Sequence, residues 1–80
     1  MGNIGEKIRK IREIRNMSRK YVAFELMIST NTYGKIERDE IDITLKRLYH
    51  ISKILNVGIT TIIEFDENKF LDNSRAKKFL

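Results

Sequence analysis

The chain has no cysteine, no proline and no tryptophan in its 80 residues. The lack of cysteine excludes a disulfide framework, a zinc site with thiolate ligands and a thiol nucleophile. The lack of proline permits uninterrupted helices, and small domains without disulfides or metals usually rely on helix–helix packing. No apolar run reaches the roughly 18–20 residues of a membrane span, and no basic-then-apolar leader opens the chain. We expect one small, soluble, cytoplasmic domain.

Positive charge exceeds negative charge, with 16 Lys and Arg residues against 11 Asp and Glu and a net charge of +5. The excess is concentrated in residues 6–20, where seven cations accompany two glutamates, whereas residues 36–42 are acidic. A basic balance suggests a polyanionic partner, but solvated surfaces are often this basic. The charge alone therefore leaves the partner open.

Apolar residues recur at helical spacing almost throughout the chain. Ile4, Ile8, Ile11 and Ile14 form the stripe of a first helix, which we expect to end near Asn16 because Asn tolerates the left-handed conformation. Three further helices should start after the N-caps Ser18, Ser29 and Thr44, and a fifth after a turn at 56–58. Ile59, Ile62 and Ile63 fit the fifth helix. The expected inward-facing residues of the other three are Val22, Ala23, Leu26, Tyr33, Ile36, Leu45, Leu48, Tyr49, Ile51, Ser52 and Leu55.

The two inward-facing tyrosines, Tyr33 and Tyr49, are expected to keep their hydroxyls at the edge of the core. Composition changes after Phe65, where residues 66–80 become polar with isolated apolar side chains. This tail is interpreted as a frayed end or as a segment for dimerisation or partner docking, and Asn73 and Ser74 could cap a short helix within it. We therefore place the folded domain at residues 1–65.

The stretch from Arg19 to Arg38 carries most of the functional information. Two short helices are joined by a tight turn, and Ala23 is small where the second helix must cross the first. If Tyr33 and Ile36 face inward, the outward positions of the second helix are short or polar: Thr30, Asn31, Thr32, Gly34 and Lys35. This pattern is typical of a helix-turn-helix whose second helix enters a DNA major groove.

The chain resembles the Xre/Cro-type helix-turn-helix domains, the five-helix fold of phage repressors and many bacterial regulators. The resemblance covers residues 4–65. It rests on IGEKIR at 4–9, MSR at 17–19, ISTNTY at 28–33, IER at 36–38, TLKRL at 44–48 and ISKILNV at 51–57. These pieces, five when 28–38 is counted as one, are specific in register, although each alone is weak. The resemblance implies an all-α, five-helix DNA-binding domain.

The resemblance also implies roles for single residues. Arg19 takes the position at which the family usually has a phosphate-contacting Gln. Thr30 and Asn31 correspond to the residues that read base edges, and Lys35 to the exposed position one turn later. Thr32 would suit a phosphate or a thymine methyl group. A plain solvated surface is the competing interpretation for each of these residues.

The family also keeps a semi-buried ion pair between the first helix and the end of the third, which would here join Arg12 to Glu37. Three positions depart from the family pattern. Met27 replaces a turn Gly at a cost of roughly 1 kcal/mol, Gly34 lies inside the recognition helix, and Asp39 replaces another Gly. Acidic residues around Asp39 weaken the case for phosphate contact in that loop.

An enzyme is not expected, because the sequence suggests no nucleophile–base pair, no Gly-rich phosphate loop and no metal-ligand cluster. No cofactor or metal is expected, and His50 is assigned no ligand or acid–base role. The basic face of the first helix is interpreted as a solvated face.

The sequence therefore predicts a transcriptional regulator, a repressor rather than an activator, that binds a palindromic operator on double-stranded DNA as a homodimer. The alternative is a protein-interaction module of the same fold, such as the antitoxin of a toxin–antitoxin pair, with its partner at the C-terminal tail or on the surface of the fifth helix. A third interpretation makes these residues the N-terminal domain of a longer regulator.

Overall fold

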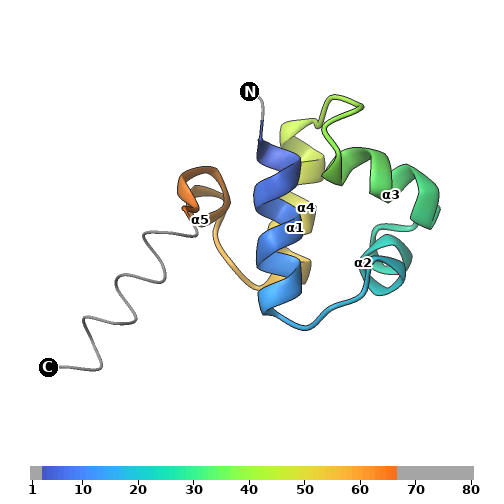
Figure 1. Cartoon of the computed structure of the whole chain (residues 1–80), viewed down its shortest axis with the longest axis horizontal. Helices are drawn as coiled ribbons and strands as arrows, with labels where there is room; N and C mark the ends of the chain where they lie inside the picture. Colours follow the sequence, from blue (N-terminus) through green and yellow to red (C-terminus); the bar gives the residue numbers. More distant parts are fainter. Residues whose placement is uncertain (1–2, 67–80) are drawn as a thin grey trace, which may run out of the picture.

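Five α-helices and no strand make up residues 3–66, the part of the chain that the computed structural model describes. The helices are α1 Ile4–Ile14, α2 Arg19–Leu26, α3 Thr30–Glu37, α4 Leu45–Leu55 and α5 Ile59–Glu64. In Figure 1, α1 and α4 occupy the middle of the view, α2 and α3 lie to one side, and α5 lies to the other. The predicted all-α, five-helix architecture is confirmed.

The helix boundaries follow the local signals in the sequence. Ser18, Ser29 and Thr44 each accept a hydrogen bond of 3.0 Å from the backbone N–H three residues further on. Asn16 and Asn56 follow α1 and α4 with φ of 58° each, in the left-handed region that reverses the chain. All three predicted N-caps and the predicted end of the first helix are confirmed.

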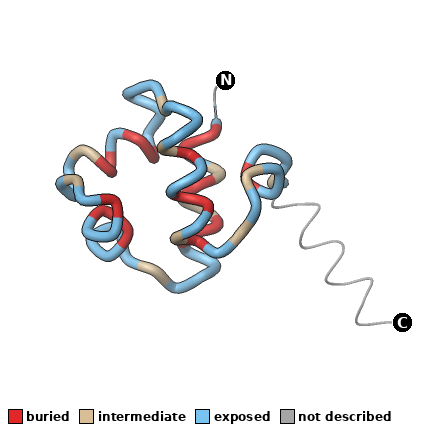
Figure 2. The backbone as a smooth tube through the Cα atoms, turned by 180° about the vertical axis from the view of Figure 1, so that it is seen from behind, coloured by how far each residue is buried: buried red, intermediate tan, exposed pale blue. Residues whose placement is uncertain are grey.

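The core is a single cluster to which every helix contributes. Figure 2 shows the buried positions turned toward the interior along α1 and the helix pair beside it. The buried apolar residues are Ile4, Ile8, Ile11, Val22, Ala23, Leu26, Tyr33, Ile36, Leu48, Ile51, Leu55 and Ile62. Because the twelve lie on five helices, no helix can leave the cluster without exposing apolar surface.

Three residues that were predicted to face inward are exposed: Ile14, Leu45 and Tyr49. At 100° per residue, Ile14 lies about 80° from Ile4 around α1, because three-residue steps drift off the stripe. Leu45, 73% exposed, begins α4 at the edge of its buried stripe, and Tyr49, 52% exposed, lies further around the helix. The ring of Tyr49 instead receives the Lys53 ammonium, 5.1 Å from its centroid.

The start of α1 is joined closely to the end of α3. The backbone N–H of Gly5 donates to Asp39 Oδ1 at 2.9 Å, while the α1 N-cap Asn3 makes no side-chain capping bond. A Cβ on Gly5 would lie 2.1 Å from the carbonyl oxygen of Ile36. Gly5 therefore permits the close approach, and Asp39 caps α1 from a distant loop. The helix cap expected at 73–74 lies outside the described residues.

Candidate nucleic-acid interface

α2 and α3 form a pair of short helices joined by a turn of few residues. Met27 occupies the turn with φ 61°, and its N–H donates to the carbonyl of Phe24 at 3.0 Å. The N–H of Ile28 donates to the carbonyl of Ala23 at 3.1 Å, which closes the end of α2. Ala23 is buried on the face of α2 that contacts α3. A methionine thus adopts the left-handed conformation expected at this position.

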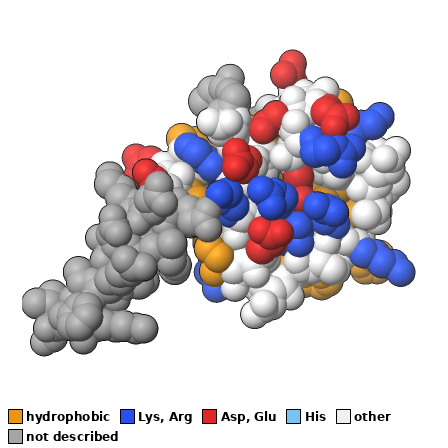
Figure 3. Space-filling view, in the orientation of Figure 1, with side chains coloured by type: hydrophobic (Ala, Val, Ile, Leu, Met, Phe, Trp, Pro, Cys, Tyr) orange, Lys and Arg blue, Asp and Glu red, His pale blue; other side chains and the backbone are white. Residues whose placement is uncertain are grey.

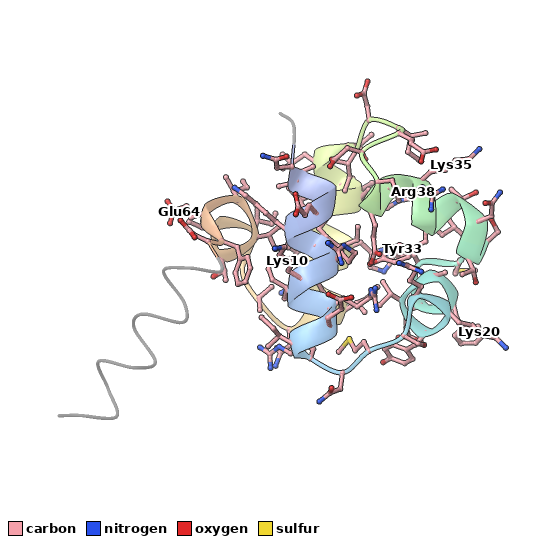
Figure 4. The ribbon with its side chains drawn as sticks, viewed as in Figure 1. Lys10, Lys20, Tyr33, Lys35, Arg38 and Glu64 are labelled. Atoms are coloured by element: carbon pink, nitrogen blue, oxygen red, sulfur yellow. The ribbon has the colours of Figure 1, made fainter. Side chains whose placement is uncertain are left out.

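The outer face of α3 carries three exposed polar side chains. Thr30 and Asn31 are neighbours in the first turn, and Lys35 follows Asn31 one turn later, while Tyr33 and Ile36 are buried on the opposite side. In Figure 4, Lys35 points away from the body of the domain and Tyr33 points toward the interior. The arrangement leaves one polar face of α3 open to a partner.

Two further residues of α3 are less exposed than the sequence predicts. Gly34 lies on the outward side of α3 as predicted but is buried there, because the guanidinium of Arg38 covers it. Thr32 is half-buried, and its Oγ1 accepts a hydrogen bond of 2.9 Å from the hydroxyl of Ser29. Thr32 is therefore turned toward the helix N-cap rather than fully outward.

The structure brings Arg12 and Glu37 together in an ion pair that is almost completely shielded from solvent. Arg12 Nε donates to Glu37 Oε2 at 2.6 Å and Nη2 donates to Oε1 at 3.3 Å, with side-chain exposures of 8% and 1%. Arg12 Nη1 also donates to the carbonyl of Met17 at 2.7 Å. This pair links α1, the chain before α2 and the end of the helix carrying the open face.

Arg19, at the start of α2, shares the same carboxylate. Its Nε donates to Glu37 Oε1 at 3.1 Å, while half of its side chain remains exposed. Burial raises the pKa of Glu37, but hydrogen bonds from Arg12 and Arg19 outweigh burial and leave the pKa of Glu37 below its usual range. One carboxylate thus stays ionised between two guanidinium groups, and the cluster keeps a net positive charge.

Comparison with known protein families identifies the family to which the chain belongs. The family model HTH_3, described as helix-turn-helix, matches residues 8–62, which is more than half of the chain. The chain belongs to the helix-turn-helix family. No curated protein and no solved structure gives a match. The predicted resemblance to Xre/Cro-type domains is confirmed.

Membership of the helix-turn-helix family settles the broad function. Domains of this family bind DNA and regulate rather than catalyse, so this chain is a DNA-binding helix-turn-helix regulator. α2 and α3 are the two helices of its helix-turn-helix, so α3 takes the place of the second helix, which lies in the major groove when such motifs bind DNA.

One residue of this helix-turn-helix was not picked out from the sequence. Arg38 directly follows α3, and its guanidinium lies back along the helix over Gly34. Its Nη1 is 2.9 Å from the position that a Cβ atom added to Gly34 would take. Its Nε forms an ion pair with Glu40 Oε2. The spacing Gly34–Arg38, one helical turn, was the available signal, because residues four apart on a helix are neighbours and a glycine leaves space for the longer side chain.

The basic stretch of α1 is largely occupied within the helix-turn-helix domain itself. Arg9 pairs with Glu13 at 3.4 Å, Lys10 with Glu6 at 3.8 Å, and Lys7 donates to the carbonyl of Ile63 at 2.6 Å. Figure 3 shows positive and negative side chains interspersed over α1 and the adjoining end of α3. Such surface pairs contribute little stability, but they lower the local positive field.

Other kinds of site find no support in the part of the chain that the structure describes. Residues 3–66 hold no group of three or more His, Cys, Asp or Glu side chains placed to bind a metal ion. Over the same residues, no helix combines the length and the apolar character needed to cross a membrane.

Proposed function

We propose that this helix-turn-helix regulator binds a roughly palindromic operator as a homodimer and represses transcription in the cytoplasm. The observation that carries the proposal is the open face of α3. Thr30, Asn31 and Lys35 are exposed there, and within residues 3–66 their side chains make no hydrogen bond or ion pair. Polar groups without protein partners on a groove-entering helix are available to base edges.

Each residue has a role that its chemistry supports. Lys35 donates to guanine O6 or N7, Asn31 pairs with adenine, and Thr30 contacts a neighbouring base edge. Arg19 binds a phosphate through the terminal nitrogens that its bond to Glu37 leaves unused. Thr32 contributes a phosphate or thymine-methyl contact, limited by the turn of its side chain toward Ser29. Phosphate contacts position the protein, and base contacts select the sequence.

A dimer follows from the size of the recognition element. One eight-residue helix contacts only a few base pairs, so a single copy reads a short half-site. Two copies related by a two-fold axis would place recognition helices in successive major grooves about 34 Å apart. Repression follows if such a site overlaps a promoter, because the bound dimer then excludes polymerase.

Selection of bound duplexes from a random pool, followed by gel shift at several salt concentrations, tests the proposal. We expect a palindromic consensus and an affinity that falls steeply with salt. Asn31→Ala with Lys35→Ala should weaken discrimination between bases by about 1–3 kcal/mol per contact. Lys53→Ala on α4 is the control with the same loss of charge. An affinity insensitive to salt, or unchanged by the double substitution, would contradict the proposal.

A second candidate, an antitoxin-like interaction module, is favoured by an exposed apolar face on α2. Phe24 and Met27 are 75% and 91% exposed, and Phe24 borders a hollow of about 480 Å³ shared with Tyr21 and Ile28. A stoichiometric partner that dissociates on Phe24→Ser but remains after removal of residues 67–80 would place it on α2. Loss of the partner only on truncation would place it on the C-terminal tail.

A further inference from the structure

Arg38 belongs to the same outward face of α3 as the proposed base-reading residues. Thr30, Gly34 and Arg38 follow one another at four-residue intervals, and Asn31 and Lys35 form the adjacent stripe. Because Gly34 has no side chain, the Arg38 guanidinium lies on the helix surface. Its Cζ is 3.7 Å from the position that a Cβ atom added to Gly34 would take. Arg38 is thus held along α3 rather than extended into solvent.

The guanidinium of Arg38 is already engaged by an anion of the chain itself. Its Nε donates to Glu40 Oε2, and the two side chains are 54% and 48% exposed. Within residues 3–66, no other acceptor takes the terminal nitrogens of Arg38. Glu40 therefore occupies one edge of the planar fork with which arginine binds a phosphate.

The neighbouring acids do not share this position. Asp39 directs Oδ1 to the backbone N–H of Gly5, so its carboxylate serves the α1–α3 junction. Asp42 is exposed and forms no ion pair within the described residues. Of the three acids in the loop after α3, only Glu40 is bound to a cation of the recognition helix.

We propose that Glu40 is an intramolecular competitor of DNA for Arg38, which lowers the affinity of the helix-turn-helix for the DNA backbone. The inference rests on the proposed function, because it assumes that the face of α3 meets a duplex. A phosphate must displace Glu40 before it binds the whole fork of Arg38. Once displaced, the carboxylate lies close to the phosphates and repels them. Both effects weaken contacts that carry no sequence information.

The test is a double-mutant cycle on the full chain, with a fluorescent 24-base-pair duplex recovered by selection from a random pool. Glu40→Gln keeps the shape of the side chain and removes its charge. It should tighten binding by about two- to fivefold, the range expected for release of an exposed ion pair. The slope of log affinity against log salt should steepen by up to about 0.9, the value for one phosphate contact.

The control variants separate this competition from a general effect of negative charge. Asp42→Asn removes an equal charge from the same loop without an ion pair and should change affinity by less than Glu40→Gln. In an Arg38→Ala background, Glu40→Gln should lose most of its effect. Circular dichroism checks that every variant remains helical.

The possible outcomes distinguish a failure of the competition between Glu40 and DNA from a failure of the proposed DNA binding. Equal effects of Glu40→Gln with and without Arg38, or equal effects of Glu40→Gln and Asp42→Asn, overturn the inference and leave DNA binding intact. If the native chain retains no duplex from the pool, the proposed function fails and this inference fails with it. A Glu40→Gln gain that disappears in the Arg38→Ala background establishes the competition.

Discussion

At the scale of single residues, the buried hydroxyl of Tyr33 is the least satisfied polar group of the domain. Tyr33 is completely buried, and its hydroxyl has no hydrogen-bond partner within residues 3–66, whereas the sequence led us to expect it at the edge. Burial raises the pKa of this hydroxyl, and the nearby Glu37 carboxylate raises it further, so it stays neutral. A buried hydroxyl without a partner costs free energy of folding.

Tyr33→Phe should therefore leave the free energy of unfolding unchanged or raise it by about 1 kcal/mol, because it removes that unsatisfied group while keeping the ring. Urea unfolding followed by circular dichroism measures the difference. Ser52→Ala is a suitable control, because the Ser52 hydroxyl donates to the carbonyl of Tyr49 at 2.6 Å and its loss should destabilise. A loss above about 1 kcal/mol on Tyr33→Phe would show that the hydroxyl is hydrogen-bonded in solution.

The carboxylate of Glu37 makes stability depend on acid pH. Its folded-state pKa lies below the unfolded value of 4.5, so the folded chain releases the proton more readily than the unfolded chain. The resulting stabilisation is fully present above pH 4.5 and is lost as the pH falls through the folded-state pKa. As the pH is lowered from 4.5, we expect the thermal midpoint of the native chain to decrease. The thermal midpoint of Glu37→Gln should decrease less steeply over the same range. Parallel slopes in both chains between pH 3 and 6 would contradict this assignment.

At the scale of elements, two glycines inside helices have opposite surroundings. Gly5→Ala should lower the free energy of unfolding by about 3 kcal/mol or more, because the new Cβ would meet backbone oxygens of α3 at 2.1 and 2.7 Å. Gly34→Ala is the matched control. Its Cβ meets only the mobile end of Arg38, so the helix propensity of Ala should raise stability by up to about 1 kcal/mol. Equal effects in denaturant titrations would mean that α1 and α3 separate in solution.

The turn of the helix-turn-helix contains a strained residue that packing does not explain. Met27 has φ 61° and is almost fully exposed, so Met27→Gly loses little contact and relieves an unfavourable backbone conformation. We expect a gain of about 0.5–1 kcal/mol in unfolding free energy. Asn56→Gly, at φ 58°, should gain less because Asn tolerates this region better. If Met27→Gly destabilises the domain, the Met27 side chain makes contacts that stabilise the fold.

At the scale of the whole molecule, the twelve buried apolar residues of the described part of the chain lie between Ile4 and Ile62. A chain ending at Asp66 should therefore unfold cooperatively, with a thermal midpoint within a few degrees of the full chain, since it keeps all twelve. Differential scanning calorimetry of both chains is the measurement. A broad transition, or a drop of more than about 10 °C, would show that residues 67–80 stabilise the domain and would move the boundary expected at 65.

The net charge of +5 does not tell which cations are open to a partner, whereas the structure does. The cations of α1 are engaged within the domain, Arg9 and Lys10 by acids of the same helix, whereas Lys35 and part of Arg19 stay open on α3 and α2. Under the proposed function, net charge promotes encounter with DNA at long range, while Lys35 and the unused nitrogens of Arg19 provide the contacts.

The sequence alone determined the five helices, the N-caps of α2, α3 and α4, and the helix-turn-helix, because these depend on spacing and on residues close along the chain. Exposed Leu45 and Tyr49 were misplaced because the pattern of α4 does not show how wide its buried stripe is. Only the tertiary structure decided that Asp39 caps α1, that Glu37 is shared by Arg12 and Arg19, and that Arg38 lies over Gly34 beside Glu40. These contacts depend on side-chain direction and on the approach of distant helices, which periodicity does not encode.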